Sequence, residues 1–261
     1  MTILDKIIAH KRIETEERKL SHPVKVLERS KFFSSRVHSL SREVARKDKH
    51  GIIAEFKRKS PSKGIINANV TVEAVTTGYV SAGASGLSVL TDNNFFGGSN
   101  EDFIAARSVN HCPMLRKDFV IDEYQIVEAK SIGADAILLI AAALEPKKLK
   151  ELANFAHSLG LEVLMEVHDK EELKLNEDAS VELIGVNNRS LKTFEVNIEI
   201  SKELASLMPA GVVKVSESGI ESIQAINDLR TYGFQGFLMG QHFMQQADPG
   251  KAAATFINQL G

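Results

Sequence analysis

The sequence predicts an α/β protein, a closed (β/α)8 TIM barrel with a helical extension at its N-terminus. Strands are indicated by eight short apolar runs, which begin near Ile52, Leu87, Pro113, Ala136, Glu162, Leu183, Val213 and Gly236. Helices are indicated by the segments between these runs, because in residues 145–159, for example, apolar side chains recur at helical spacing. Strands that alternate with helices in this way are typical of β-α-β units and a parallel sheet.

The helix exits also repeat along the chain. Gly83, Gly133 and Gly233 each end a predicted helix and are followed within a few residues by an apolar strand. Eight such units close naturally into a barrel of about 250 residues. An open, doubly wound sheet is the structural alternative, but eight regular units without a break in composition favour the barrel.

Residues 1–48 are predicted to form a helical arm on a single barrel domain that spans residues 1–261. Thr2 and Asp5 have the spacing of a helix N-cap, and an apolar stripe follows them. Pro23 then breaks this first helix. We expect the arm to pack across one end of the barrel.

Composition and charge exclude several classes of function. The formal net charge of −2 argues against nucleic acid as the main partner, and no apolar run reaches the ~18 residues of a membrane span. The N-terminus lacks the apolar core of a signal peptide, so a cytoplasmic location is expected. Cys112 is the only cysteine, which rules out an intramolecular disulfide. Without metal-ligand spacings or a nucleotide-binding motif, neither metal nor cofactor is expected.

Two charged residues, Glu55 and Lys57, lie in the apolar stretch of the first predicted strand. Residues two apart in a strand point to the same side, so both share a face with Ile53. Burial of a carboxylate and an ammonium costs several kcal/mol unless the groups are paired or used for chemistry. This pair is therefore the first candidate for a functional site.

Further polar residues come near the C-terminal ends of later strands with the same inward parity. They are Lys117 in the third strand, Glu166 in the fifth, Asn187 in the sixth and Glu217 in the seventh. Any one of them alone could be a strand-end residue in solvent. Because active sites of such barrels form at the C-terminal ends of the strands, we expect these side chains to converge on one mouth. Lysines among glutamates suit general acid–base catalysis near neutral pH.

A phosphate site is predicted beside these residues. Ser218 and Gly219 follow the seventh strand, and Gly240 follows the eighth. Glycine lets backbone N–H groups approach an anion closely, and the loops after strands seven and eight often bind phosphate in this fold. Each glycine alone could be a turn residue, but their joint position favours the phosphate site.

The loop of residues 57–64 carries four basic residues and two hydroxyl groups. Pro61 holds Ser60 extended, and Gly64 leaves the far end mobile. A solvated surface loop is the alternative interpretation. We expect the loop to lie above the mouth and to become ordered when an anionic substrate binds.

One long motif and six shorter ones run along the predicted barrel in a fixed order. The first is Ile52-Ile-Ala-Glu-Phe-Lys-Arg-Lys-Ser-Pro-Ser-Lys-Gly64. The shorter ones are Ser88–Asp92, Phe95–Ser99, Leu115–Phe119, Leu164–Val167, Gly185–Arg189 and Ser216–Gly219. Together they resemble the indole-3-glycerol phosphate synthase family of tryptophan biosynthesis, over about residues 50–245. The first motif is family-specific, and the N-terminal helical arm agrees with the family as well.

The resemblance implies a decarboxylating carbon–carbon lyase that acts on 1-(2-carboxyphenylamino)-1-deoxyribulose 5-phosphate. The family closes the indole ring of this substrate with loss of carbon dioxide and water, without a cofactor. The substrate carries a phosphate, a ketose and an aromatic carboxylate. These groups suit the predicted phosphate site, the acid–base residues and the basic loop.

The resemblance also implies roles for the charged residues. Lys117 would protonate the ketose carbonyl during ring closure, and Glu166 would act as a base in the later proton losses. Lys57 would assist dehydration or stabilise negative charge, and the division of roles between the two lysines stays open. Glu55 would polarise and orient both lysines.

Other residues are implied in holding the substrate. Asn187, Glu217 and Ser218 would position it, and Arg189 and Ser60 are candidates for binding the aromatic carboxylate.

Backbone N–H groups near Gly219 and Gly240 would hold the phosphate, whereas Pro61 and Phe119 would form part of the wall around the aryl ring. Gln241 departs from the family, which often has a small hydroxyl or acidic residue there. This departure puts a side-chain contact with the phosphate in doubt and leaves the backbone contact open.

Two rival functions are disfavoured. A phosphoribosylanthranilate isomerase would need a cysteine–aspartate pair at strand ends, but Cys112 lies before its strand. A non-catalytic barrel that binds phosphate or a partner would not need Lys117 together with Glu166. The expected partner is a small phosphorylated substrate. The expected state is a monomer, and weak contacts with other enzymes of the pathway are the alternative.

Overall fold

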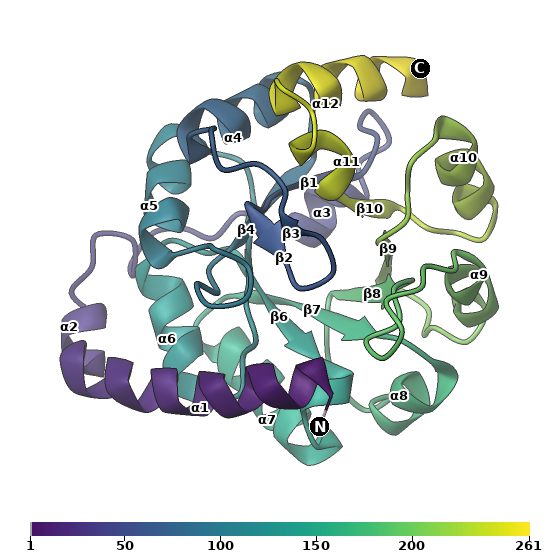
Figure 1. Ribbon diagram of the computed structural model, residues 1–261. Coiled ribbons are helices and arrows are strands. Elements are labelled where there is room, and N and C mark those ends of the chain that lie inside the picture. The colour runs from purple at the N-terminus through teal and green to yellow at the C-terminus, as the bar shows by residue number, and fades with distance from the viewer. Residues whose placement is uncertain (1) are drawn as a thin grey trace.

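The computed structural model describes residues 2–261 and contains eight parallel strands closed into a barrel (Figure 1). The barrel strands are β1 (Ile52–Phe56), β4 (Gly86–Leu90), β5 (Met114–Lys117), β6 (Ala136–Ile140), β7 (Glu162–Val167), β8 (Leu183–Asn187), β9 (Val213–Glu217) and β10 (Gly236–Met239). Each strand begins within one residue of its predicted start. Strand β1 pairs with both β4 and β10, so the closed barrel is confirmed and the open sheet is wrong.

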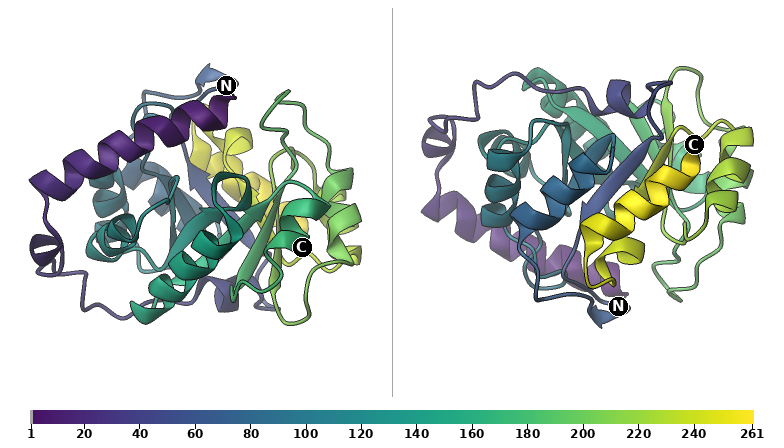
Figure 2. Two further views of the ribbon diagram at one scale, coloured as in Figure 1. Left: turned by 90° about the horizontal axis from the view of Figure 1, so that it is seen from below. Right: turned by 90° about the horizontal axis from the view of Figure 1, so that it is seen from above.

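Helices surround the barrel (Figures 1 and 2). They are α4 (Val72–Ser81), α5 (Asn100–Val109), α6 (Glu123–Ser131), α7 (Pro146–Ser158), α8 (Lys170–Leu175), α9 (Glu199–Ala205), α10 (Ile223–Thr231) and α12 (Pro249–Ile257), with the short elements η1 (Ala141–Ala143), α11 (Gln241–Met244) and η2 (Asn258–Leu260). Gly78 of α4 and Gly250 of α12 let these two helices pack closely, because a Cβ on Gly78 would lie 2.9 Å from the Gly250 Cα. This contact closes the ring of helices.

The strands bury side chains on both faces, as expected for a parallel sheet covered by helices. One alternating set, which includes Ile53, Leu115 and Leu164, fills the interior of the barrel. The other set, which includes Ile52 and Ala54, packs beneath the helices. Because side chains alternate with period two, the inward set ends at the C-terminal mouth of the barrel.

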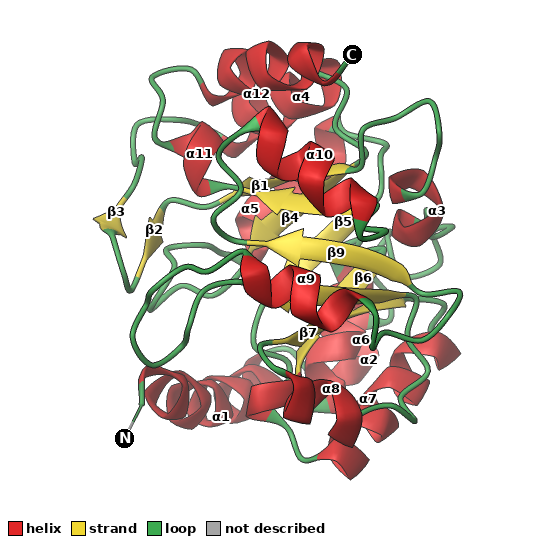
Figure 3. Cartoon of the chain, turned by 90° about the vertical axis from the view of Figure 1, so that its right-hand side faces the viewer, coloured by secondary structure: helices red, strands yellow, loops and turns green. Residues whose placement is uncertain are grey.

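The N-terminal arm contains α1 (Ile3–Ser21), α2 (Val24–Leu27) and α3 (Leu40–Val44). Thr2 and Asp5 form the predicted cap, with each side chain accepting a hydrogen bond from the backbone N–H of the other residue. Figure 3 places α1 beside the end of the barrel that carries β2 and β3, and α3 at the opposite end. The connecting segment follows the side of the barrel, where the His38 N–H donates to Asp135 at 2.7 Å. The arm therefore reaches both ends, and the expectation of one end was incomplete.

A buried ion network attaches α1 to the C-terminal end of the barrel. The Lys11 Nζ atom lies 3.0 Å from Asp92, which follows β4, and 2.9 Å from Asp118, which follows β5. Only 2% of Lys11 is exposed. The network continues from Asp118 to Arg116 and Glu128. The opposite charges of the network compensate one another inside the protein. A single unpaired charge at this depth would cost several kcal/mol.

The loop predicted over residues 57–64 contains a small antiparallel hairpin of β2 (Lys59–Ser60) and β3 (Gly64–Ile65). Gly64 adopts a φ of +67°, which only glycine adopts at little cost. The hairpin projects at the same end of the barrel as the start of α1 (Figure 3). Within residues 2–261, none of the helices has the length and apolar character needed to cross a membrane.

Candidate active site

A cavity of about 400 Å³ opens at the C-terminal end of the barrel, a size that suits a small-molecule ligand. It is lined by all thirteen predicted site residues: Glu55, Lys57, Ser60, Pro61, Lys117, Phe119, Glu166, Asn187, Arg189, Glu217, Ser218, Gly219 and Gly240. Three of them, Glu55, Glu166 and Glu217, are 2–3% exposed. The alternative of strand-end carboxylates in solvent is therefore wrong for these three residues.

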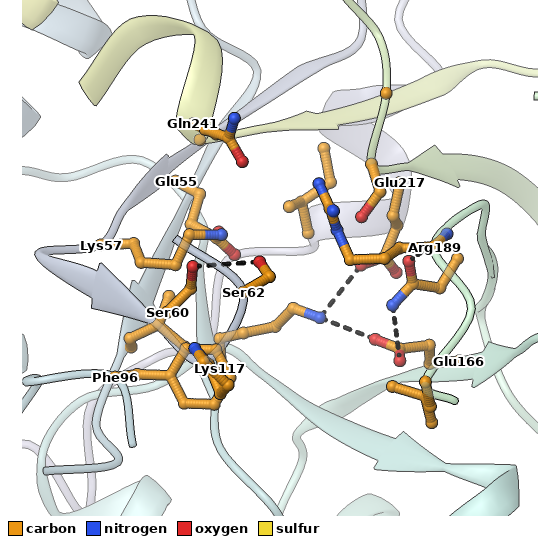
Figure 4. Close-up of a pocket in the computed structure, with 18 of the residues that line it drawn as sticks. Glu55, Lys57, Ser60, Ser62, Phe96, Lys117, Glu166, Arg189, Glu217 and Gln241 are labelled. Carbon is orange, nitrogen blue, oxygen red and sulfur yellow. Dashed lines mark hydrogen bonds and ion pairs between the residues drawn. The ribbon is translucent and has the colours of Figure 1, made fainter. Parts of the chain in front are cut away.

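Lys117 lies between two carboxylates at the centre of the cavity (Figure 4). Its Nζ atom is 2.7 Å from Glu166 Oε2 and 3.0 Å from Glu217 Oε2. The Asn187 Nδ2 atom donates to the other oxygen of Glu166 at 3.0 Å. Gly185 leaves room for this arrangement, because a Cβ there would lie 2.2 Å from Glu217 Oε1. The strands β5, β7, β8 and β9 together hold one ammonium against two carboxylates.

The charges of this cluster shift the pKa values of its members in different directions. Burial by itself would lower the pKa of Lys117, but the nearby carboxylates outweigh it and raise that pKa. Burial raises the pKa of Glu217 to about 7, although Lys117 opposes the shift. Burial also disfavours ionised Glu166, but Lys117 and His168 together hold its pKa below the usual range. Two carboxylates that share one ammonium thus separate into an ionised group and a group that holds its proton near neutral pH.

Glu55 and Lys57 form a second pair at the end of β1. The Lys57 Nζ atom lies 2.6 Å from Glu55 Oε1, and the Ser88 hydroxyl donates to Glu55 Oε2 at 3.2 Å. These contacts offset the cost of burying the charge of Glu55. Lys57 is the only one of the loop's four basic residues that lines the cavity.

The other basic residues of the 57–64 loop do not line the cavity. Arg58 forms an ion pair with Asp102, and the Lys59 Nζ atom donates to the carbonyl oxygen of Asn94 at 2.7 Å. Lys63 is exposed. Arg58 and Lys59 instead fasten the loop to the barrel, Arg58 to helix α5 and Lys59 to the segment between β4 and α5.

The turn after β9 has an unusual backbone. Ser218 has a φ of +67° and Gly219 a φ of +74°, and strained backbone of this kind occurs often at functional sites. The Asn188 Nδ2 atom donates to the Ser218 carbonyl at 3.0 Å and holds the turn. A Cβ on Gly219 would lie 2.2 Å from the Val196 Cγ1 atom, so the close approach of these loops requires glycine.

Gly240 stands at the start of α11, the short helix after β10. A Cβ at this position would lie 2.7 Å from Glu55 Oε1, so glycine is needed for the close packing. A helix start brings several unpaired N–H groups together and favours anions. Gln241 also lines the cavity, beside these N–H groups.

Apolar residues form another part of the cavity wall. The rings of Phe96 and Phe119 lie 5.8 Å apart. Ile3, Leu4 and Ile7 of α1 contribute as well, which the sequence analysis did not predict. The apolar stripe of α1 was the available signal, but it does not reveal which surface the helix covers. Among residues 2–261, no group of three or more His, Cys, Asp or Glu side chains could hold a metal ion.

Comparisons with known proteins agree with this geometry. The family model described as indole-3-glycerol phosphate synthase matches residues 4–256. The chain is 47% identical over 258 residues to the indole-3-glycerol phosphate synthase of Bacteroides thetaiotaomicron, across 99% of this chain and 98% of that protein. The chain belongs to this family. Its activity is therefore indole-3-glycerol phosphate synthesis in tryptophan biosynthesis, and it is a decarboxylating carbon–carbon lyase.

A second indole-3-glycerol phosphate synthase, from Burkholderia vietnamiensis, is 42% identical over 258 residues and 98% of each chain. More distant likeness extends to other barrels. A thiamine phosphate pyrophosphorylase from Pyrococcus furiosus superposes with a TM-score of 0.60 at 15% identity, over 85% of this chain and 99% of the other. A chain of the tryptophan synthase complex from the same organism gives a TM-score of 0.59 at 12% identity, over 81% and 97% of the two chains. At such identities these structures support the fold alone.

Proposed function

We propose that Lys117 is the general acid of ring closure and that Glu166 is the base of the later proton loss. This proposal rests on the position of the Lys117 Nζ atom, which is held between Glu166 and Glu217 inside the mouth. A lysine so placed stays protonated and lies at a fixed position. A substrate oxygen that reaches this position meets a positioned proton donor, which is the requirement for general acid catalysis.

The chemistry balances with these groups. The aryl carbon that bears the carboxylate attacks the ketose carbon, and the Lys117 proton passes to the carbonyl oxygen. The bond to the carboxylate then breaks, carbon dioxide leaves, and its electron pair restores the aromatic ring. The new hydroxyl leaves as water, and Glu166 takes the proton of the neighbouring methylene carbon. Overall, one proton is taken up from solvent.

We assign Lys57 to the dehydration step, as the donor of the proton with which the hydroxyl leaves. Lys57 lines the same cavity and lies 2.6 Å from Glu55. This carboxylate would hold the ammonium in place and, as a charge near Lys117 as well, would orient both lysines. Two separate lysines can thus serve two successive protonations.

The remaining site residues would hold the two anionic ends of the substrate and so keep its reacting atoms together, which lowers the entropic part of the barrier. Backbone N–H groups at Gly219 and Gly240 would bind the phosphate. Arg189 and Ser60 would bind the aromatic carboxylate until it leaves.

The rest of the substrate would lie between these ends. Asn187, Glu217 and Ser218 would position the sugar chain, and Pro61 and Phe119 would contact the aryl ring. All of these side chains line one cavity of a size that suits the substrate.

We further propose that the reaction runs without metal or cofactor, because the mouth supplies its own acid and base. Residues 1–261 would form a single domain and act as a monomer in the cytoplasm.

The test is a fluorescence assay on the carboxyphenylamino-deoxyribulose phosphate, without added metal or nucleotide. Lys117→Ala should lower kcat about 100- to 10,000-fold, while inorganic phosphate still binds. Lys251→Ala is the matched control, because this lysine of α12 has 87% of its side chain exposed. A Lys117→Ala protein with the turnover of the unmodified chain would refute the assignment.

A further inference from the structure

His168 lies directly after β7, two residues beyond Glu166, and does not line the cavity. Its Nδ1 atom is 3.2 Å from Glu172 Oε2, and its Nε2 atom is 3.4 Å from Glu166 Oε1. The backbone N–H of His168 donates to the same oxygen of Glu172 at 2.8 Å. The imidazole, with 12% of its side chain exposed, is therefore held between a carboxylate of α8 and the proposed base.

The two carboxylates determine which form of the ring is stable. A neutral imidazole carries one N–H group, and its other nitrogen presents a lone pair. In either neutral tautomer, this lone pair would face the carboxylate of Glu166 or of Glu172. Only the imidazolium presents an N–H group to both. The Nε2 atom is buried and makes no hydrogen bond within residues 2–261, so its 3.4 Å contact with Glu166 Oε1 is a charge contact and not an aligned hydrogen bond.

We propose that His168 is a positioning residue, held as an imidazolium between Glu172 and Glu166, that keeps the Glu166 carboxylate ionised and oriented for proton removal. The proposal rests on the proposed role of Glu166 as the base. His168 would act on Glu166 from outside the cavity.

The surrounding charges agree with a cationic ring. Glu166 of β7, Glu172 of α8 and Glu217 of β9 all act on it, and η1, which packs against β7 and α8, carries only alanines. Burial by itself would lower the pKa of His168, but the hydrogen bond to Glu172 and the other carboxylates raise it above its ordinary value. Lys117 contacts the opposite oxygen of Glu166, so the base lies between two cations.

The experiment measures kcat and KM against pH for four variants and the titration of His168 by NMR. His168→Gln keeps a side-chain N–H group but removes the charge. It should lower kcat about tenfold with little change in KM, which is less than the roughly 100- to 10,000-fold rate effect typical of a positioned base itself. Glu172→Gln should move the alkaline limb of kcat to lower pH, because His168 then loses its proton more easily. In the unmodified chain His168 should titrate above about 6.5.

His157→Gln is the matched control, because His157 also lies 3.2 Å from a glutamate, Glu182, but on α7 and outside the cavity. It should leave kcat and its pH profile unchanged.

The fourth variant, Glu166→Gln, separates the two proposals. Full activity of this variant would overturn the base role of Glu166 itself. Loss of activity in Glu166→Gln, with unchanged kcat in His168→Gln, would overturn the role of His168 alone. Titration of His168 at or below about 6.5 would do the same. If His168→Gln does not fold, the Glu172→Gln profile and the NMR titration decide the question.

Discussion

One buried lysine in the attachment of α1 to the barrel can be tested directly. Lys11 lies within 3.0 Å of both Asp92 and Asp118, which are 0% and 1% exposed. Lys11→Met keeps the length of the side chain but removes its charge, so it leaves two buried carboxylates with one cation fewer. Loss of one partner from a buried ion pair costs about 3–5 kcal/mol.

The structure narrows this range. Asp118 would keep its contact with Arg116 at 3.2 Å, and Asp92 would still accept backbone N–H groups from Phe95 and Phe96. We therefore expect a loss near the lower limit, about 3 kcal/mol in the free energy of unfolding. Because α1 also contributes Ile3 to the cavity wall, KM should rise as well.

The assay is urea unfolding at pH 7, with Lys19→Met as the control on the same helix. Lys19 contacts Glu16 and Asp122 but keeps 34% of its side chain exposed, so its removal should cost less than about 1 kcal/mol. An equal, small loss in both variants would refute the reasoning, because it would mean that burial adds nothing to the Lys11 contacts.

The stability that Lys11 and Asp118 contribute together should depend on pH. Burial disfavours the ionised form of Asp118, but Lys11 and Arg116 outweigh it and hold its pKa well below the usual range. A carboxyl whose pKa is lowered by folding stabilises the protein above its unfolded pKa, about 3.9, and loses this contribution as the pH falls further. The difference between Lys11→Met and the unmodified chain should therefore shrink as the pH falls below about 4.

Two further predictions concern the mouth. Gly185→Ala would place a Cβ 2.2 Å from Glu217 Oε1 and displace this carboxylate from Lys117, so kcat/KM should fall about 100-fold; an unchanged kcat/KM would contradict the proposed geometry. The 57–64 loop should exchange its amide hydrogens more slowly once the phosphorylated substrate or product is bound, because Lys57 and Ser60 already line the cavity. Exchange that is the same with and without ligand would show that the loop does not become ordered.

The sequence by itself determined the barrel, the starts of its strands and the inward direction of the residues at the mouth. The strand starts and the inward direction follow from local periodicity, since alternate side chains of a strand point to opposite faces whatever the rest of the chain does. The barrel was inferred from the number and regularity of the β-α units. Glu55, Lys117, Glu166 and Glu217 could be assigned to one mouth for this reason, and the cap of Thr2 and Asp5 is local as well. The catalytic roles of these residues stay predictions.

Only the tertiary structure decided which charges meet. Lys117 contacts carboxylates 49 and 100 residues further along the chain, and no local pattern reveals such partners. The attachment of Lys11 to Asp118 and the place of His168 behind Glu166 were missed for the same reason. A pKa depends on burial and on distances to charges from other strands. The raised pKa of Glu217 is therefore a property of the closed barrel, because closure brings the strands together and excludes water from between them.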